Sequence, residues 1–223
     1  MIEINGLEGV HFRLPAASIP AGELAAVVAP SEPCAREFVD LLLGLAPPLK
    51  GSVRLLDREI ASPDGRARLA LRGVVGFAAQ AQGLVGHLAL RENILLGVGY
   101  HQGFAEESVD DRVRTMLGWC GWPEDDARRA FLLLPEQASP FERSGAAWLR
   151  AALGEPELLV CEDLFSGLAP DERRRLVGAS VAFQSEKPSR GSVFVLVNDR
   201  LLEEIQPTSV LYLSRGGDFR AET

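Results

Sequence analysis

The most constraining feature of this sequence is a short apolar run followed at once by a segment of helical period. The run from Glu23 to Ala29, ELAAVVA, is bounded by glycine and proline, as expected of a buried strand. Apolar side chains then recur at helical spacing, at Phe38, Leu41, Leu42 and Leu45. Pro47 and Pro48 are expected to end this helix. A buried strand joined to a helix by a tight loop is the building unit of an α/β sheet.

The rest of the chain repeats these two kinds of element. Further strands are expected at Gly51–Leu56, Gly73–Ala79, Pro156–Asp163, Ser192–Asn198 and Ser209–Ser214. Helices are expected within 90–134, where Val109, Val113, Met116 and Leu117 share one face, and over 143–153 and 171–183. Strands at both ends with helices between them predict an α/β domain with a mainly parallel sheet and a helical insertion.

Charge and cysteine usage exclude several classes of protein. The net charge of −8 disfavours nucleic acid as a partner, because phosphate backbones are bound by clustered lysine and arginine. Three separated cysteines without a CxxC pair predict neither a disulfide framework nor a metal site. The first residues lack the pattern of a signal peptide, and no apolar stretch approaches the roughly 20 residues that span a bilayer. A cytoplasmic protein is therefore expected.

In its order of motifs the chain resembles the nucleotide-binding subunit of ABC transporters over nearly its whole length. The matching segments are IPAGELAAVVAPSEP, LLLGLAPPLKGSVRLLDREI, GFAAQAQGLVGHLALRENILLG, LPEQAS, LRAALGEPELLVCEDLFSGLAPDERRRL and VFVLVNDRLLEE. The resemblance implies a P-loop NTPase-type, RecA-like fold with an N-terminal antiparallel β portion. It implies one domain over 1–223, with a core at about 1–82 and 156–223 and a helical subdomain at about 83–155. It also implies a membrane permease as partner, and ATP with Mg²⁺ as ligands.

The phosphate loop of this family has the form G-x-x-x-x-G-K-[ST], and here its chemistry is missing. The degenerate loop comprises Ala29, Pro30, Ser31, Glu32, Pro33, Cys34, Ala35, Arg36 and Glu37. Ala35 stands for the lysine and Arg36 for the hydroxyl residue, while Glu32 and Glu37 are expected to place negative charge where phosphate would sit. Arg36 is not expected to replace the lysine, because one residue along a helix turns the side chain by about 100°.

The catalytic positions are altered as well. The family's Asp-Glu pair is inverted to Glu162-Asp163, interpreted as two solvated carboxylates at a strand end, and Asp163 is too short to position water well. The switch histidine is replaced by Asn198, which cannot take a proton, and the D-loop aspartate by Ala169. No catalytic residue or bound metal is therefore expected, and ATP and Mg²⁺ are expected only if the residual site still binds them.

Two further family motifs differ in how well they are kept. The signature loop, LSGGQ in the family, reads Ser139, Pro140, Phe141 and Glu142 after an alanine. Pro140 and Phe141 are expected to remove donors and add bulk where a partner subunit's nucleotide would bind. Gln80 matches the Q-loop glutamine, and the segment that follows it matches the surface that receives the permease. We do not assign Phe12 as the aromatic residue that stacks on the adenine base.

Three functions remain open from the sequence alone. The first is a non-catalytic structural or regulatory subunit, suggested by substitutions at Ala35, Arg36, Asp163, Ala169 and Asn198. The second is a nucleotide-binding switch without turnover, in which Arg36 and Glu162 hold Mg-ATP. The third is a weakly active ATPase with Asp163 or Asp199 as its base.

The expected setting follows from the same resemblance. It implies a location at the inner face of the cell membrane, reached through a permease, beside a second intact ATPase subunit or another copy of the chain. A short segment, RENILLGVGYHQGF followed by VRTMLGWCGW, is similar to the ATPases of MCE and Mla-like lipid transport, so lipid is the substrate class that it suggests.

Overall fold

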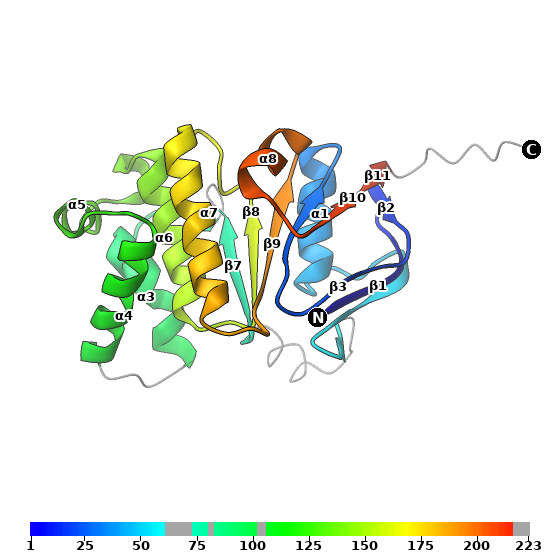
Figure 1. Cartoon of the computed structure of the whole chain (residues 1–223), viewed down its shortest axis with the longest axis horizontal. Helices are drawn as coiled ribbons and strands as arrows, with labels where there is room; N and C mark the ends of the chain where they lie inside the picture. Colours follow the sequence, from blue (N-terminus) through cyan, green and yellow to red (C-terminus); the bar gives the residue numbers. More distant parts are fainter. Residues whose placement is uncertain (61–72, 80–82, 102–105, 216–223) are drawn as a thin grey trace, which may run out of the picture.

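The structure is a computed structural model, and it describes residues 1–60, 73–79, 83–101 and 106–215. Its backbone forms two sheets and a group of helices (Figure 1). The predicted α/β class with a parallel sheet is confirmed.

The five strands of the central sheet are all parallel to their neighbours. They are β4 (Leu24–Val28), β7 (Val75–Ala79), β8 (Leu158–Glu162), β9 (Gly191–Leu196) and β10 (Ser209–Tyr212). Their spatial order is β10-β4-β9-β8-β7. All residues of β4, β8 and β9 are buried, as expected of parallel strands covered on both faces. The carboxyl ends of β4, β8 and β9 therefore meet at one edge of the sheet.

A second sheet is antiparallel and lies beside the first. It contains β1 (Ile2–Glu8), β2 (Phe12–Leu14), β3 (Ala17–Ile19), β5 (Lys50–Leu55), β6 (Arg58–Glu59) and β11 (Ser214–Arg215). The sequence predicts one strand over 209–214, but the chain leaves the parallel sheet after Tyr212 and joins β2 at Ser214. The prediction of a single strand is thus wrong, because the chain passes from one sheet to the other at the buried Leu213.

The helices divide between the two sides of the parallel sheet. They are α1 (Glu32–Leu42), α3 (Leu90–His101), α4 (Glu106–Trp119), α5 (Glu124–Ala130), α6 (Pro140–Leu153), α7 (Pro170–Ser185) and α8 (Leu202–Ile205), with short 3-10 turns η1 (Pro135–Gln137) and η2 (Asp199–Leu201). Figure 1 shows α3, α4, α5 and α6 grouped on one side and α1 with the antiparallel sheet on the other. The boundaries of a helical subdomain at residues 83 and 155 remain a prediction.

Alternation along the parallel strands divides the interior into two cores. Side chains such as Leu159 and Phe194 face the core shared with α3, α4, α6 and α7, whereas their neighbours Val160 and Val193 face the core shared with α1 and the antiparallel sheet. The first core contains the buried side chains of Trp122 and Trp148.

Helix α1 ends earlier than the sequence predicts. It stops at Leu42, and Gly44 adopts a φ of +65°, a conformation that glycine tolerates and that turns the chain away. Leu45 is consequently 54% exposed instead of lying on the buried face. The prolines at 47 and 48 follow this turn and do not cause it.

Candidate functional site

The predicted phosphate loop is mostly helix. Helix α1 begins at Glu32, so only Ala29, Pro30 and Ser31 form the loop after β4. The amide of Ala35 already donates to the carbonyl of Ser31 at 3.0 Å. A phosphate loop needs glycines whose free amides surround the β-phosphate, but here there is no glycine and the amides enter the helix.

The first turn of α1 is also a poor anion site. Pro33 has no amide hydrogen to donate to an anion. Glu32 places a carboxylate in that same turn. The positive end of the helix dipole, worth about 0.3 to 1 kcal/mol for an exposed anion, is therefore the remaining attraction for phosphate there.

Beside α1 lies a cavity of about 290 Å³ at the carboxyl edge of the parallel sheet. Its lining consists of Glu32, Ala35, Ala79, Glu162, Asp163, Val195 and Val197. Ala35, at the lysine position, is 3% exposed and contributes only a methyl group to the wall. Among the described residues, the lining thus offers three carboxylates, and the nearby Arg36 is paired with one of them, which is a poor setting for a triphosphate.

Arg36 occupies this site in a way that the sequence did not predict. Its Nη1 donates to Oε2 of Glu162 at 3.1 Å, and its Nε lies 3.2 Å from Oδ1 of Asp40. Glu162 is only 9% exposed. Its interpretation as a solvated carboxylate is therefore wrong, because the strand end is covered and an arginine from α1 pairs with it.

The two carboxyl groups after β8 are both destabilised as anions. Burial raises the pKa of Glu162, and nearby Asp40 and Asp163 raise it further, whereas Arg36 acts in the opposite direction. Asp163 is exposed, as the sequence predicts, but partial burial of its carboxyl group and then the charge of Glu32 raise its pKa. Asp163 also has a φ of +47°, in the left-handed region. These groups crowd negative charge together at the edge where nucleotide phosphates would lie.

Glu37 does not face the cavity. Its carboxylate accepts from the amides of Val10 at 2.5 Å and His11 at 2.8 Å, in the turn between β1 and β2. A side chain at Gly9 would collide with this carboxylate. The expectation that Glu37 adds negative charge at the phosphate position is thus wrong, because one turn of helix directs it toward the antiparallel sheet.

Cys34 and Phe12 also serve the packing of α1. The Cys34 thiol is buried and donates to the carbonyl of His11, with the Ser31 hydroxyl 3.1 Å from its sulfur. The Phe12 ring is fully buried and meets Phe38 edge to face, with centroids 5.8 Å apart. Phe12 is therefore unable to stack on an adenine.

Asn198 and Ala169 both lie at helix starts. The Asn198 side chain accepts from the amide of Arg200 at 3.0 Å and caps η2. Ala169 precedes α7, and its amide donates to the Glu172 carboxylate at 2.8 Å. Each residue thus has a local structural role, and neither can exchange a proton at neutral pH.

The signature positions start helix α6. Ser139 is its N-cap: its hydroxyl accepts from the amide of Glu142 at 3.3 Å, and the Glu142 carboxylate accepts from the Ser139 amide at 2.7 Å. Phe141 is 7% exposed and meets Trp122 with ring centroids 5.5 Å apart. The expectation that Phe141 adds bulk at a partner's site is thus wrong, because its ring points into the chain's own core.

Gln80 lies outside the described residues, but the loop that follows it is held by a residue that the sequence analysis missed. Asn93 is fully buried, accepts from the Val85 amide at 2.6 Å and donates to the carbonyls of Val85, Leu88 and Ala89. These bonds fix the loop 83–89 before α3. The sequence signal that could have identified this residue is a polar side chain within an apolar helical pattern.

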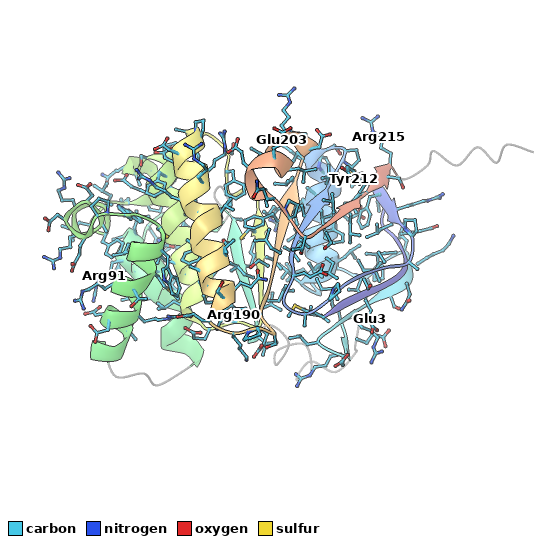
Figure 2. The ribbon with its side chains drawn as sticks, in the orientation of Figure 1. Glu3, Arg91, Arg190, Glu203, Tyr212 and Arg215 are labelled. Atoms are coloured by element: carbon cyan, nitrogen blue, oxygen red, sulfur yellow. The ribbon has the colours of Figure 1, made fainter. Side chains whose placement is uncertain are left out.

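A second missed group joins α4 to the end of α7. The Arg190 guanidinium is 4% exposed and lies over the Phe183 ring at 3.8 Å. It donates to Glu155 at 2.5 Å, while Arg112 pairs with both Glu155 and Glu186. Figure 2 labels Arg190 at the lower end of α7, beside the sheet.

The donor set does not fit Mg-ATP. Among the described residues, no group of three or more histidine, cysteine, aspartate and glutamate side chains is arranged to hold a metal ion. The family's hydroxyl ligand is absent at Arg36, and the Glu162 carboxylate is already paired with the Arg36 guanidinium.

In the part of the chain that the structure describes, no helix is both long enough and apolar enough to cross a membrane.

No family model matches the sequence, but similar proteins are named as ATP-binding proteins of transport systems. The chain is 27% identical over 153 residues to the probable ribonucleotide transport ATP-binding protein mkl of Mycobacterium tuberculosis, covering 69% of this chain and 41% of that protein. It is 24% identical over 201 residues to the carnitine transport ATP-binding protein OpuCA of Listeria monocytogenes, covering 90% and 48%. The chain therefore spans less than half the length of these relatives.

Solved structures show the same fold. The dimeric post-hydrolysis ATP-binding cassette MJ0796, bound to ADP and phosphate, superposes with a TM-score of 0.80 at 17% identity, covering 96% of this chain and 94% of that one. The protein cbiO1 of Clostridium perfringens, part of the ABC transporter complex cbiONQ, gives a TM-score of 0.72 at 14% identity, covering 96% and 87%.

Proposed function

We propose that this chain, which has the fold of the ATP-binding cassettes, works as a non-catalytic structural or regulatory subunit of a membrane transport complex. The observation that carries the proposal is the start of helix α1 at Glu32, which converts the phosphate loop into helix. Family membership alone does not establish function, because function depends on the site.

The chemistry of the cavity supports the same conclusion. ATP binding in this fold needs a lysine, a hydroxyl group and amides free to surround a phosphate. Ala35 stands at the lysine position, Arg36 stands at the hydroxyl position and is paired with Glu162, and helix α1 already begins at Glu32. Three carboxylates line the cavity, so a triphosphate would meet like charge there.

Catalysis would meet a second obstacle. General-base work on water requires a carboxylate or imidazole within about 3 Å of the attacking water. Asp163 follows β8 with a shorter side chain than the family's glutamate, and Asn198 lacks a titratable group. These features support a subunit without turnover.

The two alternative functions fit the geometry less well. A nucleotide-binding switch would use Arg36 and Glu162 to hold Mg-ATP, but these side chains are bonded to each other. A weakly active ATPase would need Asp163 or Asp199 as its base, and Asp199 lies in the first turn of η2.

The names of the relatives support the kinds of partner that we propose for this chain. Their names describe ATP-binding proteins of transport systems, and MJ0796 is described as dimeric. We extend this to a permease at the inner face of the membrane and to a second ATPase subunit or a second copy of this chain. Lipid as the transported class rests on the segment that begins at Arg91, of which residues 102–105 lie outside the described residues.

The proposal is tested by measuring release of phosphate from Mg-ATP by the purified chain and by Asp163→Asn. Equal background release by both supports a subunit without turnover. Steady hydrolysis by the native chain that Asp163→Asn abolishes would show an active ATPase and overturn the proposal.

A further inference from the structure

One ion pair joins helix α1 to strand β8 across the candidate site. Nη1 of Arg36 lies 3.1 Å from Oε2 of Glu162, although 126 positions separate the two residues in the sequence. The second contact of Arg36, with Asp40, lies within α1. The Arg36–Glu162 pair is thus a direct link between the helix and the sheet edge.

The sequence positions of Arg36 and Glu162 indicate what this ion pair replaces. In P-loop ATPases the hydroxyl residue after the lysine and a carboxylate at the end of a strand hold Mg²⁺ between them. Arg36 stands at the first position in this sequence and Glu162 at the second. A side-chain cation therefore joins two positions that a metal ion joins elsewhere in the fold.

We propose that the Arg36 guanidinium takes the place of the divalent cation, so that this chain carries its own cation and keeps α1 tied to β8 without Mg²⁺ or nucleotide. This inference rests on the proposed function and explains how such a subunit stays folded at its degenerate site. It makes Arg36 a positioning residue and an internal competitor of the metal.

The charges around the pair support this role. Glu162 is nearly buried, and further carboxylates lie near it on Glu32, Asp40 and Asp163. A buried carboxylate without a cation is costly, so some positive group is needed at this point. A guanidinium stays charged at all physiological pH values. Unlike a dissociable metal, it is always present at the site.

The ion pair is tested by a double-mutant cycle of Arg36→Ser and Glu162→Gln, followed by thermal unfolding in the presence of a chelator. Arg36→Ser is expected to lower Tm by about 3 to 6 °C, because it leaves the nearly buried Glu162 carboxylate without its cation. Glu162→Gln removes a carboxylate whose ionisation burial already opposes, so it should change Tm less. The double variant is expected to lose less than the sum of the two single variants, since Arg36→Ser no longer leaves a charged group without its partner. Arg128→Ser, which breaks an exposed pair with Glu124 at 2.7 Å, is the matched control and should leave Tm unchanged.

The metal substitution is tested by adding Mn²⁺ to the same proteins. Tm of the native chain should not respond, whereas Tm of Arg36→Ser should rise, because the freed carboxylates are oxygen ligands of the kind that Mn²⁺ accepts. Arg36→Lys keeps the charge, so it should remain insensitive to Mn²⁺. Arg36→Gln removes the charge but keeps more of the side chain, so it should respond to Mn²⁺ and preserves the test if Arg36→Ser does not fold.

Either of two results would overturn the inference: additive losses in the cycle, or an equal Mn²⁺ response of the native chain and Arg36→Ser. Neither result tests whether the chain binds nucleotide. Binding of Mg-ATP by the native chain would instead refute the proposed function, whatever the cycle shows.

Discussion

Replacing Arg190 by alanine should lower the free energy of unfolding by about 3 kcal/mol, because its buried guanidinium satisfies several groups at once. It donates to the backbone carbonyls of Pro156 at 3.0 Å and Phe183 at 2.7 Å, and to the Glu155 carboxylate at 2.5 Å. Glu186 lies 3.5 Å from Nη1. Alanine leaves all four acceptors without this donor.

The magnitude follows from the burial of each partner. Removing one member of a buried ion pair costs roughly 3 to 5 kcal/mol, but Glu155 and Glu186 are more than a third exposed and keep Arg112 as a partner. This lowers the ionic part to about 1 to 2 kcal/mol. The two carbonyls and the contact with the Phe183 ring add about 1 to 2 kcal/mol.

The assay is urea and thermal unfolding of the native chain, Arg190→Ala and Arg190→Lys. For a chain of this size, 3 kcal/mol corresponds to a fall in Tm of about 6 to 12 °C. Lysine keeps the charge but lacks the planar fork, so it should recover only part of the loss. If Arg190→Ala unfolds within a degree of the exposed control Arg128→Ala, the reasoning about this group is refuted.

Three further changes probe other parts of the account. Partial burial and the charge of Glu32 raise the pKa of Asp163, so its ionisation opposes folding. Asp163→Asn should therefore slightly stabilise the chain at pH 7, and the gain should vanish below about pH 4. A gain that does not depend on pH would contradict ionisation of Asp163 as its cause. Phe141→Ala should cost about 3 to 5 kcal/mol in urea unfolding because the ring is buried, whereas Leu132→Ala, at an 80% exposed position, should cost little; equal losses would refute this placement of Phe141. Asn93→Ala should speed amide hydrogen exchange in the loop 83–89 by about tenfold or more, and unchanged exchange would show that the loop does not depend on Asn93.

The sequence predicted the fold well where a single periodicity dominates. The buried run at β4 and the shared apolar face of α4 were assigned correctly, because burial on both sides of a parallel strand and on one side of a helix leaves a simple pattern. The errors lie at element ends. The end of α1 depends on the left-handed Gly44, and the division of 209–214 into two strands depends on which sheet offers a partner.

The candidate site was predictable in its substitutions but not in its contacts. The missing lysine at Ala35 is visible in the sequence. That Arg36 reaches Glu162 and that Glu37 turns toward Val10 could not be predicted, because both contacts depend on where the side chains lie in three dimensions, which a motif does not give. The start of α1 at Glu32 was not predicted either. A motif aligned position by position assumes the family's backbone, and here the backbone itself differs.

Calorimetric titration of Mg-ATP into the native chain measures whether the degenerate loop binds nucleotide at all. The combined variant Ala35→Lys, Arg36→Ser serves as a comparison that restores the two missing side chains. We expect no binding heat for the native chain up to millimolar nucleotide. Saturable binding at micromolar concentration would contradict it, because a helical phosphate loop beside three carboxylates should not hold a triphosphate.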